Sequence, residues 1–229
     1  MALAGERILR FSVSYGGHAR MTAAWEKSQQ PRLVAVTSED DNVIEQREAF
    51  LDAMSRAATG VTVVASDGDY GRRGQTVSAM CSVSADPPSL LVCLNRKSQL
   101  VPAIEAHRAF SVNVLRADQK RLADSFAGRP TSNDKAYDFD RVRWETGVTG
   151  SPLLSSAVAK FDCRLLEAHT IGTHTIYIGE VVASSAAKGK PLVYASRGYG
   201  ELFAFPRLQT TPLTVADIDP RIPVDLGEF

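Results

Sequence analysis

The sequence lacks an excess of charge of either sign: its 229 residues hold 26 Lys and Arg against 26 Asp and Glu, a formal net charge of zero. Proteins that bind nucleic acid usually carry a basic excess, so this balance argues against a nucleic-acid surface. It still allows a local basic pocket for a small anion. With 44% hydrophobic and 23% charged residues, a packed globular core is expected rather than a disordered chain.

Cysteine is scarce, and long apolar runs are missing. The chain has only Cys81, Cys93 and Cys163, without CxxC or zinc-ligand spacing, so we expect reduced core thiols and no disulfide framework. No apolar run approaches the ~20 residues of a membrane span, and the opening residues lack the apolar stretch of a secretory signal. These absences predict a soluble, cytoplasmic protein. Whether it starts at Met1 or Met21 is left open.

Several motifs of nucleotide, metal and hydrolase sites are also absent. The sequence has neither GxGxxG after a first strand nor GxxxxGK[ST], which argues against Rossmann and P-loop phosphate sites. The sequence has no HExxH motif and no Cys/His cluster, so it predicts no metal site. It has no GxSxG motif, so it predicts no acyl-transfer serine.

What is present is a series of short strand patterns between two irregular ends. We predict an irregular extension over 1–41, one domain over 42–205 and an irregular tail over 206–229. A helix should open with Asn42 and Glu45 as a capping box and end at Gly60, and a second should occupy 117–128, with Gly128 as its stop. Strands are predicted over 61–66, 75–85, 89–95, 109–115, 157–170, 174–184 and 191–200, with a long loop over 129–150. Many strands without a βαβ alternation favour a closed antiparallel barrel.

The strand predicted over 75–85 concentrates small polar side chains. One alternating face carries Thr76, Ser78, Ser82 and Ser84, with Met80 between them. The other face, which a half-buried strand would hide, carries Val77, Ala79, Cys81 and Val83. The hydroxyl face is either plain exposed surface or the wall of a groove for a planar heteroaromatic ring, whose edge needs several donors and acceptors.

Two further stretches have polar groups that suit a ligand. The next strand ends in Asn95, Arg96, Lys97 and Ser98, a set that suits a phosphate group or a solvated basic turn. His174 stands at the start of the strand over 174–184, either as an ordinary edge residue or over a ligand. His107 and His169 lack such a context and are predicted to be structural, and His18 falls in the N-terminal extension.

Together, the motifs FLDAMSRAATGVTVVAS, GQTVSAMCSVSADPPSLLVCLNRKS, FSVNVL, RLADSFAG and IGTHTIYIGEV resemble the flavin reductase family. These are the reductase components of two-component flavin monooxygenases, and the resemblance covers about residues 46–202. Among subgroups it is most similar to the reductases of pyrimidine utilisation and of hydroxyphenylacetate and phenol hydroxylation. The resemblance implies a mainly β, antiparallel FMN-binding split β-barrel with a few short helices, and a homodimer.

The resemblance also implies an activity. The protein would be an NAD(P)H:flavin oxidoreductase that reduces FMN or FAD by hydride transfer and supplies diffusible reduced flavin to a partner monooxygenase. FMN versus FAD, NADH versus NADPH, and bound versus shuttled flavin stay open; Arg72 and Arg73 are among the residues that could meet a 2′-phosphate. Two alternatives remain: a non-catalytic flavin-binding module, or a reductase with tightly bound flavin that acts on a corrinoid or ferric complex.

Site residues follow from the same resemblance. The isoalloxazine ring would be held by backbone amides and hydroxyls of Thr76, Val77, Ser78, Ala79, Cys81 and Ser82. The phosphate would be held by Asn95, Arg96, Lys97 and Ser98. His174, the histidine of the family's Gly-Asp-His motif, would contact the nicotinamide, and Tyr199 would lie near the flavin. Thr173 replaces the family's aspartate, which removes a carboxylate beside the histidine ring.

Overall fold

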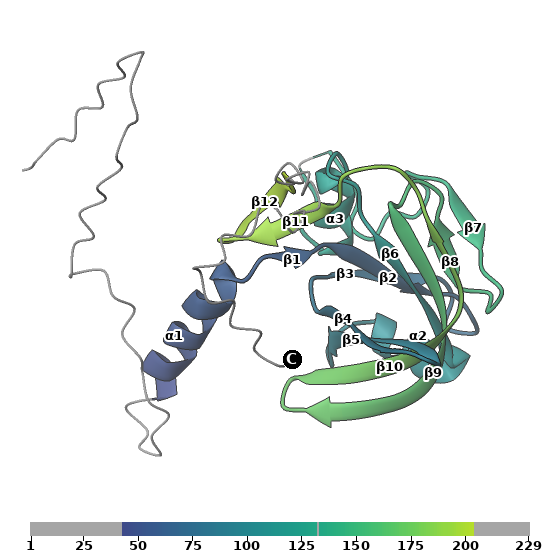
Figure 1. Cartoon of the computed structure of the whole chain (residues 1–229), viewed down its shortest axis with the longest axis horizontal. Helices are drawn as coiled ribbons and strands as arrows, with labels where there is room; N and C mark the ends of the chain where they lie inside the picture. The colour runs from purple at the N-terminus through teal and green to yellow at the C-terminus, as the bar shows by residue number, and fades with distance from the viewer. Residues whose placement is uncertain (1–42, 132, 204–229) are drawn as a thin grey trace, which may run out of the picture. The chain divides into compact units, whose positions relative to one another are not determined.

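The computed structural model describes residues 43–131 and 133–203 (Figure 1). The chain divides into two compact units, Met1–Ala49 and Phe50–Phe229. Of the first unit only residues 43–49 are described, and they are helical. Asn42 of the predicted capping box, His18 and the predicted domain limits at 41 and 206 lie outside the described residues, so those limits stay predictions.

Three helices occur among the described residues: α1 Val43–Arg56, α2 Leu100–His107 and α3 Lys120–Phe126. Helix α1 ends at Arg56, earlier than the predicted stop at Gly60, and none of its residues is buried. Helix α3 is shorter than its predicted range, but Gly128 follows it at φ 71°, the left-handed conformation of a helix stop. No described helix is long and apolar enough to cross a bilayer.

Helix α2 was not predicted. Its sequence, LVPAIEAH, holds Pro102 in the first turn, where a missing N–H costs little because the first N–H groups of a helix have no intrahelical partner. Leu100 and Ile104 are buried. This helix places the residues that follow the 89–95 strand against the sheet.

The main sheet has seven antiparallel strands in the order β3-β2-β6-β9-β10-β5-β4. Their bounds are β2 Thr62–Ser66, β3 Arg73–Val77, β4 Met80–Ala85, β5 Pro88–Asn95, β6 Ala109–Val114, β9 Ala159–Ile171 and β10 His174–Ala186. The two edge strands, β3 and β4, are consecutive in the chain and separated only by Ser78 and Ala79. Because this connection spans at most roughly 10 Å, the sheet has to curve until its edges approach, which is the barrel-like curvature seen in Figure 1. The expected antiparallel barrel is confirmed.

The single strand predicted over 75–85 is wrong. The segment forms two strands, and β3 pairs with β2 whereas β4 pairs with β5. The predicted hidden face is right at Val77, which packs against the core. It is wrong along β4, where Cys81 is exposed and Val83 is 51% exposed, while Met80 of the opposite face packs against the core. The reason is that β4 is an edge strand with a register shift between Ser82 and Ser84, so one period-2 pattern cannot describe the whole segment.

The thiols also differ from the prediction in one case. All three cysteines are free, Cys163 is buried and Cys93 is partly buried, but Cys81 is not a core thiol. Burial raises the pKa of Cys163 to about 12, so this thiol stays protonated and unreactive at neutral pH.

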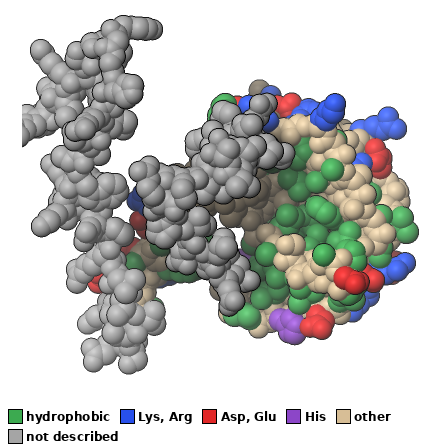
Figure 2. All heavy atoms as spheres, viewed as in Figure 1, with side chains coloured by type: hydrophobic (Ala, Val, Ile, Leu, Met, Phe, Trp, Pro, Cys, Tyr) green, Lys and Arg blue, Asp and Glu red, His purple; other side chains and the backbone are tan. Residues whose placement is uncertain are grey.

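Two smaller sheets complete the fold: β1-β11-β12 and β7-β8. Their bounds are β1 Thr59–Gly60, β7 Trp144–Thr146, β8 Pro152–Leu154, β11 Leu192–Ala195 and β12 Gly198–Glu201. The segment 191–200, which was predicted as a single strand, is therefore a two-stranded hairpin. The loop predicted over 129–150 contains the short strand β7. On the face seen in Figure 2, acidic and basic side chains alternate around the barrel unit and do not gather into one patch.

Candidate functional site

A cavity of about 340 Å³ opens between the start of β3 and the turn that follows β5. We call it the cationic cavity; its lining includes Arg72, Arg73, Gln75, Asn95, Lys97 and Ser98, and two aromatic residues, Tyr137 and Phe139. Sites for small molecules occupy about 300–1,000 Å³, so its size suits part of a nucleotide.

The turn 95–98 forms one wall of the cationic cavity. The Asn95 side-chain oxygen accepts the N–H of Lys97 at 2.9 Å. The Ser98 hydroxyl donates to the Gln75 amide oxygen at 3.0 Å and accepts the N–H of Leu100 at 3.2 Å, so it ties the turn to β3 and to the first turn of α2. Within residues 43–131 and 133–203, neither Arg96 nor Lys97 forms an ion pair, which leaves both cations available to an anion.

A second hollow, of about 150 Å³, lies along the end of β3. We call it the β3 groove; it is lined by Thr76, Val77, Ser78 and Tyr199, with Arg129 among others. The Thr76 hydroxyl donates to the carbonyl of Ala123 in α3 at 2.7 Å, so its proton is already used within the fold. Ser78 is exposed and lies between the two edge strands.

Tyr199 of β12 forms the far wall of the β3 groove. Its hydroxyl donates to the Asp124 carboxylate at 3.1 Å, and its ring packs edge-on against Tyr194 at 5.4 Å. Desolvation first, and then the Asp124 carboxylate, raise the pKa of the Tyr199 phenol to about 12. This side chain is therefore a neutral, fixed wall at physiological pH.

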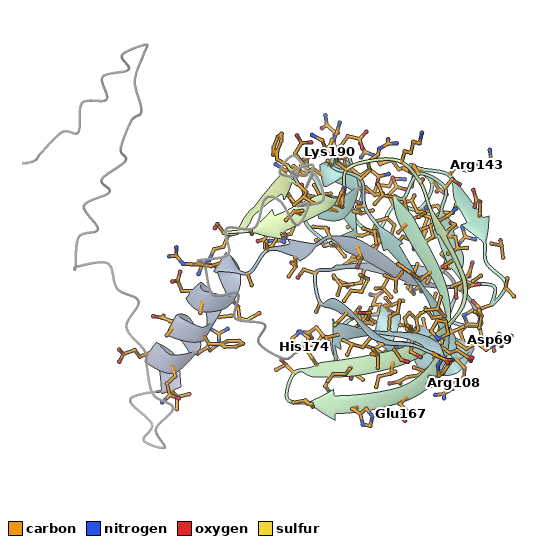
Figure 3. All side chains as sticks on the ribbon, in the orientation of Figure 1. Asp69, Arg108, Arg143, Glu167, His174 and Lys190 are labelled. Atoms are coloured by element: carbon orange, nitrogen blue, oxygen red, sulfur yellow. The ribbon has the colours of Figure 1, made fainter. Side chains whose placement is uncertain are left out.

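His174 lies at the exposed start of β10, directly across the ladder from Asn95 of β5. The Arg96 N–H donates to the Thr173 carbonyl at 3.0 Å, and the Thr173 hydroxyl lies 2.9 Å from His174 Nδ1. Gly172, at φ 55°, allows the tight turn of the hairpin. In Figure 3, His174 marks the turn end of this hairpin, at the opposite end of the barrel from Asp69 and Arg108.

The structure thus brings most of the predicted residues into neighbouring positions. Asn95, Lys97 and Ser98 line the cationic cavity, Thr76, Val77, Ser78 and Tyr199 line the β3 groove, and Arg96 and His174 share one end of the β5–β10 ladder. Ala79, Cys81 and Ser82 line neither hollow; the Ala79 carbonyl accepts the N–H of Cys93 at 3.1 Å, and the other two lie on the exposed edge of β4.

Two further histidines, His107 and His169, have partners within the described part of the chain. His107 Nδ1 lies 3.0 Å from the Ser66 hydroxyl, and exposed His169 pairs with Glu167 at 2.7 Å. Sequence reasoning missed Gln75, Tyr137 and Phe139 as cavity residues. Tyr137 and Phe139 lie in a stretch without periodicity, so no pattern could have placed them. Gln75 is the first residue of the strand predicted over 75–85, next to Thr76, so its position was a signal that could have been used.

The donor set of the two hollows fits a flavin nucleotide. The cationic cavity offers unpaired cations and the N-terminal turn of α2, and both attract a phosphate. The β3 groove offers a strand edge with hydroxyls and an aromatic wall, which suits a planar ring. Both hollows include residues of β3: Gln75 lines the cationic cavity, and Thr76 and Val77 line the β3 groove.

Known proteins are similar to this chain in sequence and in fold. An FMN reductase (NADH), RutF, of Ancylobacter novellus is 42% identical over 154 residues, covering 67% of this chain and 83% of the relative. Similar solved structures include the flavin reductase component of a bacterial two-component tryptophan halogenase, with 34% identity, a TM-score of 0.61, and coverage of 68% of this chain and 98% of that chain. The NADH:FAD oxidoreductase of Streptomyces globisporus, in complex with NAD and FAD fragments, has 30% identity, a TM-score of 0.62, and coverage of 70% and 94%. Residues 54–202 match the flavin reductase like domain, and the chain belongs to this family.

Proposed function

We propose that the chain is an NADH-dependent flavin reductase that uses FMN or FAD and passes reduced flavin to a partner monooxygenase. The observation that carries the proposal is the juxtaposition of His174 with Asn95 and Arg96, joined by the Arg96-to-Thr173 hydrogen bond, in a chain 42% identical to an FMN reductase (NADH). When both are bound, NADH supplies a hydride and the flavin ring accepts it at N5.

The turn 95–98 would hold the flavin phosphate. Lys97 and Arg96 supply positive charge, and Asn95 fixes the turn through its bond to the Lys97 N–H. Ser98 would act mainly by holding the turn against Gln75, since its proton is already donated there. A fixed, cationic turn binds an anion without reorganising, which favours affinity.

The segment 76–82 would hold the isoalloxazine ring. Val77 and Ser78 face the β3 groove, and Tyr199 supports its far side. Thr76 contributes as a backbone group, because its hydroxyl proton goes to α3. Ala79, Cys81 and Ser82 would meet the ring edge from the β4 side. Backbone N–H groups near Ser82 would stabilise the negative charge that develops at the flavin N1–C2=O edge on reduction.

His174 would bind and orient the nicotinamide, and no proton transfer is assigned to it. Positioning two rings face to face accounts for much of the catalysis when a cofactor does the chemistry. The exposed ring at the mouth of the β5–β10 ladder is placed to meet the carboxamide of a nicotinamide.

We also propose that the protein is a homodimer in the cytoplasm. Val83 on β4, Leu166 and Ile171 on β9, and Leu51 and Met54 of α1 are large apolar side chains that stay between 41% and 65% exposed in the single chain. Large apolar side chains that one chain leaves exposed could be covered by a second copy, and the three free cysteines are compatible with a reducing compartment.

The test is NADH consumption by the purified chain with FMN, with FAD and with neither. We expect turnover only when a flavin is present. Binding of FMN without NADH consumption would overturn the reductase in favour of the non-catalytic binding module. Retention of about one flavin per subunit through turnover would instead favour a reductase that acts on another acceptor.

A further inference from the structure

We propose that helix α3 fixes the width of the β3 groove and that its Asp124 is a positioning residue for the flavin ring. Asp124 lines neither the cationic cavity nor the β3 groove, and it acts through Tyr199. This inference rests on the proposed function, because it takes the β3 groove as the place of the ring. It adds a residue outside both hollows to those that determine the affinity for flavin.

The two walls of the β3 groove belong to different sheets. Thr76 and Val77 of the near wall lie on β3, an edge strand of the main sheet, whereas Tyr199 of the far wall lies on β12, an edge strand of the sheet β1-β11-β12. Among the described strands, no ladder joins β3 to β12. The hollow measures only about 150 Å³, so a small displacement of either wall changes what it admits. The separation of the walls therefore needs another support.

Two consecutive residues of α3 bond the two walls. The Ala123 carbonyl accepts the hydroxyl of Thr76 at 2.7 Å, and the Asp124 carboxylate accepts the hydroxyl of Tyr199 at 3.1 Å. Helix α3 lies beside β11 and β12 (Figure 1). Because both acceptors belong to one turn of helix, these bonds tie the walls to each other at a defined separation.

The helix itself is held firmly enough to act as this support. Phe126 of α3 is fully buried, and a Cβ at Gly74 of β3 would lie 2.8 Å from its ring, so the missing side chain at Gly74 lets the strand approach the helix. The Ser125 hydroxyl donates to the Lys135 carbonyl at 2.7 Å. Packing of this density leaves little room for the helix to shift.

The bond to Asp124 is the directional contact of Tyr199. It is the only hydrogen bond of the Tyr199 side chain within residues 43–131 and 133–203. The ring also meets Tyr194 edge-on at 5.4 Å and lies 5.8 Å from the Lys120 Nζ, contacts that constrain direction less than a hydrogen bond does. Desolvation and then Asp124 raise the pKa of the Tyr199 phenol, and the charge of Arg129 opposes them.

The first test measures the dissociation constant of FMN by quenching of its fluorescence, without NADH. We expect Asp124→Ala to raise this constant about fivefold, the effect of one ordinary hydrogen bond. Asp124→Asn keeps an oxygen acceptor and should stay within about twofold of wild type. The KM for NADH at saturating FMN should not follow the change. Asp118→Asn removes an exposed carboxylate that pairs with Arg116 just before the helix; it is the matched control and should change neither constant.

The second test asks whether the two bonds act as one connection. Thr76→Val releases the near wall from α3 and should raise the dissociation constant of FMN about as much as Asp124→Ala. Once either bond is lost, the separation of the walls is no longer fixed. The double variant should therefore stay within about twofold of the larger single effect, well below the product of the two, which independent sites would give.

A third readout needs no flavin. The titration of Tyr199 is followed by the ultraviolet absorbance of tyrosinate, as the difference between a protein and the same protein with Tyr199→Phe. Asp124→Asn should lower the pKa of the Tyr199 phenol, because the carboxylate that disfavours the phenolate is gone. An unchanged titration would contradict the contact between the two side chains.

The positioning role is overturned by an unchanged dissociation constant of FMN in Asp124→Ala, by an equal loss in Asp118→Asn, or by a double variant that reaches the full product. Should Asp124→Ala fail to fold, an unchanged constant in Thr76→Val overturns the role instead. Failure of the proposed function is distinguishable, because the wild-type chain would then neither bind FMN nor consume NADH with it.

Discussion

Polar groups inside the barrel differ in their hydrogen-bond partners from those at the end of the sheet that holds Asn95, Thr173 and His174, which we call the open end. Inside, Ser111, Asn113 and Asp162 are fully buried, and each is satisfied by other groups of the fold. Asn113 donates to the Val63 carbonyl at 3.1 Å and accepts the N–H of Leu154 at 2.7 Å. The Thr149 N–H donates to Asp162 at 2.9 Å. These bonds attach the segment 149–154 to the sheet.

At the open end, the polar side chains are exposed and bond mainly within their own turns. The Asn95 side chain accepts the N–H of Lys97, two residues later in the same turn, and the Thr173 hydroxyl lies within hydrogen-bond distance of its neighbour His174. A buried polar group without a partner is costly, so the interior groups are retained for stability. Exposed groups gain little from such bonds, and their concentration at one end of the sheet is better explained by a ligand.

The largest expected loss of stability follows from a substitution inside the barrel. Asn113→Leu removes the side-chain bonds of one buried amide and leaves the Leu154 N–H and the Val63 carbonyl without that partner. We expect a loss of about 2–4 kcal/mol in the free energy of unfolding, measured by urea denaturation. Asn95→Ala at the open end is the matched variant, with an expected loss below about 1 kcal/mol. Equal losses for the two asparagines would remove the distinction between the two regions.

A smaller effect on stability, one that depends on pH, is expected at Tyr199, which lies between the two regions. Burial raises the pKa of the Tyr199 phenol in the folded protein to about 12, above the usual value of a tyrosine, so the folded state keeps a proton that the unfolded chain loses. The stabilisation is complete below pH 10 and is lost as the pH rises toward 12. Tyr199→Phe should therefore be less stable than wild type at pH 9, and this gap should shrink by pH 11.5, as followed by urea denaturation. A gap that stays constant with pH would contradict the assigned environment of the phenol.

The smallest effect on stability is expected at Ser82 on the exposed edge of β4. Ser82→Ala should change the free energy of unfolding by less than about 0.5 kcal/mol and raise the KM for FMN about threefold, the loss of a weak hydrogen bond. Cys163→Ser, inside the core, is the contrasting variant and should destabilise the fold without a specific effect on FMN. An unchanged KM for FMN would remove Ser82 from the flavin site.

The sequence predicted those parts of the fold that local chemistry determines. Gly128 after α3 adopts positive φ, as expected for the predicted helix stop. The prediction failed where pairing between distant segments determines the strands, because nothing in QTVSAMCSVSA shows that the chain passes from one sheet edge to the other at Ser78. The same holds for Tyr137, which reaches the cationic cavity only through the tertiary fold.

The central claim is that the open end binds flavin and nicotinamide while the interior only supports it. The most direct measurement is steady-state NADH oxidation with FMN for His174→Ala, together with its unfolding by urea. We expect a KM for NADH raised about tenfold, equivalent to about 1.4 kcal/mol, with kcat within about twofold and unchanged unfolding. An unchanged KM with a sharp fall in kcat would contradict the binding role of His174 and the account built on it.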